Sequence, residues 1–215
     1  MASFEETVSI NESLEHDSVL SGTPGEHLAQ TRFGSAQRAQ AFYRQQVFPK
    51  LNDAMQRFVL KQEFVFIATA NAKGHADSSF RAGPPGFIHI LTPTLLAYPE
   101  YRGNGVMASV GNLLENPHVG MMFIDFFKST IGLHVNGTAR VVDNEDLADE
   151  PEGTAAILKD SQVNGGAQQE CWVLVKVKEA YIHCAKHIPL LAKQEKPVHW
   201  GTDEERHKGG SFFQA

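Results

Sequence analysis

The pattern of hydrophobic and polar positions divides the chain into a helical part and a longer part rich in strands. Between Ser35 and Gln62, apolar residues recur every three or four positions, which predicts an amphipathic helical stretch that Pro49 divides into two pieces. Ser35 and Asn52 stand where the N-caps of these pieces are expected. The preceding residues 1–33 are polar and interrupted by glycine and proline, which predicts an irregular arm.

From residue 64 onward, short apolar runs bounded by turn residues predict a succession of strands. One short helix, residues 106–115, interrupts them and should end at Asn116-Pro117. Its apolar residues Met107, Val110, Leu113 and Leu114 are expected on one side. Strands in succession with a single helix among them predict a mainly β fold, a closed antiparallel barrel with helical additions. The acidic, glycine-rich residues 143–169 are expected to form a helix and loop outside it. The predicted strands are 64–70, one through Ser78 and Phe80, 87–91, 94–98, 119–125, 132–142 and 171–184.

Composition and charge limit the number of domains, the partners and the compartment that we expect for this chain. The 215 residues, 42% of them hydrophobic, fit one domain with extensions. A formal net charge of -6 does not favour nucleic acid or an anionic membrane as a partner. Cys171 and Cys184 are too few for a disulfide framework, and the chain has neither a signal-like start nor a run long enough to span a membrane. We therefore expect a cytoplasmic protein that binds a small molecule.

Two segments each set one arginine among glycines and small polar residues. Arg81 stands in residues 78–87, and Arg102 stands in a second predicted turn, residues 98–105. Glycine allows close approach of the backbone to a ligand, and arginine offers planar, charge-assisted donors, so each segment is a candidate phosphate cradle. The alternative is that both arginines pair with acidic residues at the rim of the barrel.

Together these segments resemble the FMN-binding split barrel of the pyridoxamine 5'-phosphate oxidase-related proteins. The resemblance covers roughly residues 38–190. It implies an antiparallel split β-barrel with flanking α-helices, FMN as cofactor, and a homodimer with the flavin at its interface. The domain organisation it implies is an N-terminal arm (1–34), an FMN-binding split-barrel domain (35–190) and a C-terminal tail (191–215). The segments that carry the resemblance are 64–70, 79–87, 98–105, 109–120 and 137–141.

The resemblance also implies roles for individual residues. Arg81 matches the arginine that grips the flavin phosphate, with Ser79 as its hydroxyl neighbour. The turn from Tyr98 to Asn104 matches a second loop on the phosphate side, where arginine and amide side chains donate. Lys186 or His187, beyond the last strand, is expected to meet the flavin across the dimer interface. The implied cofactor-binding residues are Ser79, Arg81, Tyr98, Arg102, Asn104, Ser109, Asn112, Lys186 and His187.

The segment 180–189 gathers imidazoles, a thiol and an amine, and the residues allow several interpretations. His183, Cys184 and His187 do not have a standard zinc spacing, and we expect no metal. Cys184 could be a nucleophile activated by a histidine, or simply a buried residue beside a solvent-facing His183. Contact with the flavin, implied by the resemblance, is the interpretation we prefer.

The chain departs from the vitamin-forming oxidase itself. The oxidase has a lysine after its phosphate-binding arginine, where this chain has residues 82–86, and its closing Arg-Leu-x-Pro element has no match here. We therefore expect a different FMN-dependent oxidoreductase, with hydride passing between a nicotinamide or small organic substrate and the flavin. No residue is assigned as a general acid or base. The alternatives are a non-catalytic flavin or haem binding or sensing protein and a deazaflavin-dependent reductase.

Overall fold

The computed structural model describes residues 22–149, 169–202, 204–208 and 210. By its internal contacts the chain divides into two compact units, residues 1–49 and 50–215. In the first unit, helices α2 (Pro24–Arg32) and α3 (Ala36–Gln46) precede the two-residue strand β1 (Val47–Phe48). A hydrogen bond of 2.7 Å from Gln30 Nε2 to the Tyr43 hydroxyl joins the two helices.

Helix α2 corrects the expectation of an irregular arm up to residue 33. The Thr23 hydroxyl accepts from the Glu26 backbone N–H and the Glu26 carboxylate accepts from that of Thr23, so the two residues form a capping box. Pro24 occupies the first turn, where its missing N–H costs nothing. The proline that seemed to interrupt a pattern therefore begins a helix. The first 21 residues of the expected arm lie outside the described part of the chain.

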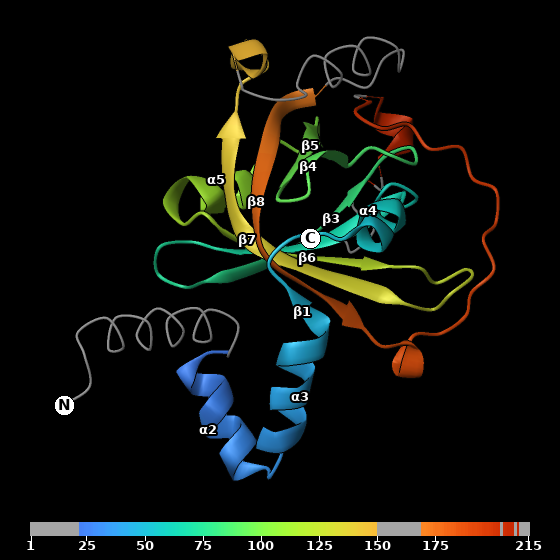
Figure 1. The fold of residues 1–215 in the computed structure, drawn as a ribbon. Coiled ribbons are helices and arrows are strands. Elements are labelled where there is room, and N and C mark those ends of the chain that lie inside the picture. The colour runs from blue at the N-terminus through green and yellow to red at the C-terminus, as the bar shows by residue number, and fades with distance from the viewer. Residues whose placement is uncertain (1–21, 150–168, 203, 209, 211–215) are drawn as a thin grey trace. The chain divides into compact units, whose positions relative to one another are not determined.

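The second unit contains strands β2 to β8. Its strands pair antiparallel in the order β3-β2-β6-β7-β8-β5-β4, with the two longest, β7 and β8, side by side through its middle (Figure 1). The fold is mainly β, an antiparallel split barrel with flanking α-helices, as predicted. Its elements are α4 (Asp53–Val59), β2 (Phe64–Ala70), β3 (Ala76–Ala82), β4 (His89–Thr92), β5 (Leu95–Tyr101), α5 (Ala108–Glu115), β6 (His118–Ile124), β7 (Gly132–Val142), β8 (Gln169–His183) and the 3-10 turns Asp146–Asp149, Ala185–His187 and Glu205–His207.

Side chains alternate between a buried and an open face along the first hairpin. On β2, Val65, Ile67 and Thr69 are buried, and the intervening residues are more exposed. The core inside the barrel includes Tyr98 and Phe123, both fully buried. Burial of this apolar face fixes the register of the hairpin, because a slip of one residue would turn it toward water.

Strand β5 is longer than predicted. Pairing with β8 continues through Tyr98 and Pro99 to Tyr101, so the predicted turn at residue 98 is wrong. Pro99 is tolerated because pairing with β4 ends at Ala97, leaving one side of β5 open where the missing N–H would otherwise be needed.

The predicted helices of the barrel unit are present, with one correction to the buried face of α5. The Asn52 side chain caps α4 by accepting from the Met55 N–H at 3.0 Å, whereas Ser35 precedes α3 without a capping side-chain hydrogen bond. In α5, Val110 and Leu113 are buried, but Leu114, expected on the same face, is 74% exposed. No helix in the described ranges is long and apolar enough to cross a membrane.

Candidate functional site

Strand β3, at one end of the sheet, approaches the part of β5 that extends beyond its pairing with β4, and the two strands leave a seam between them. These strands are not neighbours in the hydrogen-bonded order, yet Arg81 of β3 and Glu100 of β5 form an ion pair with 2.8 Å between Nε and Oε2. A pocket of about 500 Å³ opens at this seam, and we call it the seam pocket. Its lining residues are Asp77, Ser79, Phe80, Arg81, Ala82, Glu100, Tyr101, Gly103, Asn104, Gly105, Val106, Met107, Ala108, Ser109, Trp200 and Gly201.

One face of β3 supplies the polar floor of the seam pocket. Asp77, Ser79 and Arg81 alternate along the strand, so their side chains point to the same side. The Ser79 hydroxyl donates to Asp77 Oδ2 at 2.9 Å. Ser109, which is only 2% exposed at the start of α5, lies 3.2 Å from the same carboxylate oxygen and 3.0 Å from the Ser79 hydroxyl. The side chains of Asp77, Ser79 and Ser109 each line the pocket and keep oxygen lone pairs that can accept further hydrogen bonds.

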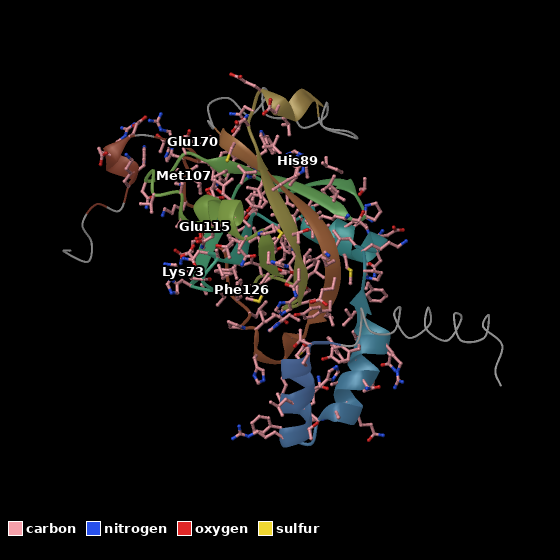
Figure 2. All side chains as sticks on the ribbon, turned by 90° about the vertical axis from the view of Figure 1, so that its left-hand side faces the viewer. Lys73, His89, Met107, Glu115, Phe126 and Glu170 are labelled. Carbon is pink, nitrogen blue, oxygen red and sulfur yellow. The ribbon has the colours of Figure 1, made fainter. Side chains whose placement is uncertain are left out.

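The loop between β5 and α5 supplies donors. The Asn104 side-chain oxygen accepts from the Val106 backbone N–H at 3.0 Å, and its amide nitrogen makes no hydrogen bond within the described residues. Gly105 has a φ of 79° and Met107 a φ of 54°, both left-handed, so the loop turns sharply before the helix begins. In Figure 2, Met107 and Glu115 mark the two ends of α5 on one side of the unit.

Arg81 is the one cationic side chain among the lining residues of the described chain, and two of its nitrogens already donate hydrogen bonds. Its Nε donates to Glu100 and its Nη1 donates to the Phe80 carbonyl oxygen at 3.1 Å, which leaves Nη2 as the nitrogen with no recorded partner in the described chain. The side chains of Arg81 and Glu100 are 18% and 11% exposed, so water screens the pair only partly. Two carboxylates, Asp77 and Glu100, thus line the same pocket as one guanidinium, and Glu100 is the one that pairs with it.

Two buried polar atoms beside this pair have no hydrogen-bond partner in the described chain, the Tyr98 hydroxyl and the Trp200 Nε1. Burial and then the nearby Glu100 charge raise the pKa of the Tyr98 phenol, so it stays protonated. Trp200 lines the seam pocket, but its Nε1 is buried, so the donors available to a ligand are Arg81 Nη2 and the Asn104 amide.

Comparison with known proteins shows the family to which the chain belongs. The family model of pyridoxamine 5'-phosphate oxidase matches residues 51–184, more than half of the chain. The chain belongs to the pyridoxamine 5'-phosphate oxidase family. No curated protein matches it significantly.

Solved structures of this family's fold are similar to the chain at low identity. A pyridoxamine 5'-phosphate oxidase-like protein from Lactobacillus delbrueckii is 20% identical, with 62% of this chain and 95% of that chain covered and a TM-score of 0.45. Tagged HupZ from Group A Streptococcus is 18% identical, with 60% and 91% covered and a TM-score of 0.46. HutZ from Vibrio cholerae, described as a haem storage protein, is 15% identical, with 62% and 94% covered and a TM-score of 0.43.

Four of the residues implied by likeness to the oxidase family meet in the seam pocket, and five lie elsewhere. Tyr98 is fully buried in the core, because it belongs to a strand and not to a loop. Asn112 of α5 donates to the Thr69 hydroxyl at 3.0 Å, which ties the helix to β2. The residues in the pocket are Ser79, Arg81, Asn104 and Ser109; those elsewhere are Tyr98, Arg102, Asn112, Lys186 and His187.

Both arginines of the two glycine-rich segments pair with acidic residues, which is the alternative stated for them. Arg102 lies 3.6 Å from Glu170, with both side chains 46% exposed. Figure 2 labels Glu170 on the same side of the unit as Met107. An ion pair this exposed contributes little to stability. The Arg81 pair is more buried and correspondingly harder to break.

The segment after β8 does not line the seam pocket of its own chain. Lys186 and His187 lie in an exposed 3-10 turn, and Cys184 is exposed, so the alternative of a buried thiol is wrong. His183 is not simply solvent-facing either, since its Nδ1 lies 3.0 Å from His134 Nε2. Among the described residues, no group of three or more metal-ligating side chains gathers.

Sequence reasoning missed two carboxylates of the seam pocket, Asp77 and Glu100. Asp77 carried a usable signal, because it stands two residues before Ser79 and four before Arg81 and therefore shares their face of the strand. Glu100 carried no such signal in the sequence, because its contact with Arg81 arises only when β3 and β5, which are not neighbours in the hydrogen-bonded order, come together.

Proposed function

We propose that the seam pocket binds FMN. The observation that carries this proposal is the arrangement of unused donors and acceptors: Arg81 Nη2 and the Asn104 amide can donate, whereas Asp77, Ser79 and Ser109 can accept. A phosphate and a carbonyl edge need donors, and a chain of hydroxyls needs acceptors. Membership of the pyridoxamine 5'-phosphate oxidase family supports the same cofactor.

The size and composition of the seam pocket suit a flavin better than haem. Its volume of about 500 Å³ lies within the range of small-molecule sites. Its lining in the described chain includes no histidine or cysteine, the side chains that most often bind haem iron from the proximal side. The flexible glycines of the β5–α5 loop let the backbone approach a ligand closely.

The residues of the seam pocket would bind and orient the cofactor and would not supply an acid or base. Bound FMN would accept and donate a hydride, and we infer that the protein is an FMN-dependent oxidoreductase that uses a nicotinamide or a small organic substrate. The Asp77 carboxylate, already accepting from two serines, would hold a ribityl hydroxyl in place. Arg81 Nη2 and the Asn104 amide would stabilise negative charge on bound oxygen atoms.

The reaction is tested by anaerobic reduction of the FMN-loaded protein. We expect a yellow protein absorbing near about 450 nm that bleaches within seconds to minutes after addition of NADH or NADPH. Bleaching by dithionite but by neither nicotinamide nor any small organic donor tested would favour a flavin-binding protein without turnover. Retention of a deazaflavin in preference to FMN would favour a deazaflavin-dependent reductase.

We also propose that the protein forms a homodimer through the open face of the β2–β3 hairpin. Phe64, Phe66, Phe80 and Phe126 form a patch of contacting rings there, with 5.5 Å between the centroids of Phe64 and Phe80. Phe80 is 54% exposed and also lines the seam pocket, so a subunit covering the patch would lie next to the cofactor. Lys186 and His187 of that subunit are then the residues expected to approach the flavin.

Substitution of Phe80 tests this interface. We expect light scattering on the native protein to give about twice the mass of one chain, and Phe80→Ser to shift it to the mass of one chain at low micromolar concentration. Leu114→Ser is the matched control, because Leu114 is exposed on α5 away from the phenylalanine rings. The interface is wrongly assigned if the native protein is monomeric or if both variants behave alike.

A further inference from the structure

A second pocket, which we call the basic pocket, lies outside the site described above. It has a volume of about 660 Å³ and shares no lining residue with the seam pocket. Helix α4, the start of β2 and the turn between β6 and β7 form its walls. Its lining residues are Ala54, Arg57, Phe58, Lys61, Gln62, Glu63, Phe64, Ile124, Asp125, Phe127, Lys128, Ser129 and Lys193.

The two carboxylates of the basic pocket are occupied by contacts of their own. Glu63 accepts a hydrogen bond from Lys193 Nζ at 2.7 Å. Burial alone would raise the pKa of Asp125, but four hydrogen bonds from the backbone and hydroxyl of Ser129 and the backbone of Phe127 and Lys128 lower it to about 2. The Asp125 charge therefore holds the β6–β7 turn and is not paired with a cation.

Three cations remain without a carboxylate. In the described part of the chain, no acidic side chain lies within ion-pair distance of Arg57, Lys61 or Lys128. This concentration of positive charge is unusual in a chain whose formal net charge is -6. Such a local charge attracts small anions by electrostatic steering even when the protein as a whole is acidic.

Aromatic side chains complete the basic pocket. Phe58, Phe64 and Phe127 line it together with the three cations, and each ring is partly exposed. Flat apolar walls bind a planar ring, and arginine and lysine bind an acid group, with arginine able to hold a phosphate or carboxylate through two parallel hydrogen bonds. We propose that the basic pocket binds a small aromatic molecule that carries a phosphate or carboxylate group.

Stabilisation of a helix end does not account for the three cations. Arg57 lies in the last turn of α4, where the helix dipole favours positive charge. However, Lys61 follows it four positions later with the same sign, and Lys128 comes from a different part of the chain, the β6–β7 turn. Like charges brought together without partners repel each other, and a bound anion would relieve that repulsion.

The proposal is tested by calorimetric titration of the full chain, loaded with one FMN per chain and freed of excess FMN, with 2-naphthyl phosphate, 2-naphthoate and inorganic phosphate. We expect 2-naphthyl phosphate or 2-naphthoate to bind at least about tenfold more tightly than inorganic phosphate, because the ring adds apolar contact. Arg57→Gln and Lys128→Gln should each weaken that binding about tenfold. The tighter of the two naphthyl compounds identifies the acid group that the pocket prefers.

Lys73→Gln is the matched control, because it removes one exposed positive charge from the turn at the far end of β2. Strand β2 runs from Phe64 to Ala70, roughly 20 Å of extended chain, before the turn that contains Lys73. Equal weakening by Lys73→Gln, or a ring that adds nothing to the affinity of the acid group, would overturn the proposal. The FMN content of Arg57→Gln should match that of the native protein. Titration of the FMN-free chain separates failure of this proposal from failure of the FMN assignment, because only the latter concerns the seam pocket.

Discussion

Replacement of Glu100 by glutamine should tighten the binding of FMN about tenfold. Glu100 occupies the Nε of Arg81 and places a second carboxylate in the lining of the seam pocket, beside the position proposed for a phosphate. Glutamine keeps a hydrogen-bond acceptor for Arg81 but removes the negative charge, so the guanidinium can share its donors with the phosphate. Quenching of flavin fluorescence during titration measures the change in affinity.

The double variant Arg81→Gln/Glu100→Gln should bind FMN at least about tenfold more weakly than Glu100→Gln alone. The two residues are changed together because removal of Arg81 by itself would leave the buried Glu100 carboxylate without its partner and destabilise the barrel. Lys176→Gln, an exposed cation of β8 outside the seam pocket, should leave the affinity unchanged. The role of Arg81 is wrong if the double variant binds FMN as tightly as Glu100→Gln.

Replacement of Gly137 by alanine should destabilise the protein by about 3 kcal/mol or more, or prevent folding. A bulge between Asn136 and Gly137 shifts the register of β7 against β8, the longest paired strands of the barrel. A Cβ at this position would lie 2.1 Å from the Lys176 carbonyl oxygen, which is backbone and cannot move aside without breaking the ladder. Chemical denaturation of the purified variant measures the loss.

Gly111→Ala is the matched control for this prediction. Gly111 lies within α5, and no atom approaches within 4 Å of the Cβ that alanine would add. Alanine should therefore stabilise the helix by up to about 1 kcal/mol, because glycine loses more backbone freedom on folding. A Gly137→Ala protein with native stability would mean that the bulge is not a constraint on the barrel.

The sequence predicted most of the barrel because its strands carry strong local signals. The hairpin of β2 and β3 follows from an apolar run, a glycine turn and a second run, and Asn52 marks the start of α4. The end of β5 was predicted too early, because Pro99 suggests a break unless the open side of the strand is known. Helix α2 was missed because its glycine and proline were weighed without the capping pair, Thr23 and Glu26.

The candidate site was harder to predict than the fold because it combines residues far apart in the chain. Ser79 and Arg81 could be placed on one face of β3 from their spacing alone. The contact of Arg81 with Glu100 and the presence of Trp200 at the seam pocket depend on closure of the barrel and on the course of the C-terminal segment. Short-range patterns in a sequence do not encode such long-range contacts.

Titration of the cofactor-free protein with FMN tests the central claim most directly. We expect saturable quenching of flavin fluorescence with a dissociation constant of about 1 µM or tighter, at one FMN per chain, and loss of most of that affinity when Asn104 is replaced by alanine together with Ser109. The result that would contradict the assignment is an unquenched flavin up to about 100 µM, or full affinity in the Asn104→Ala/Ser109→Ala variant.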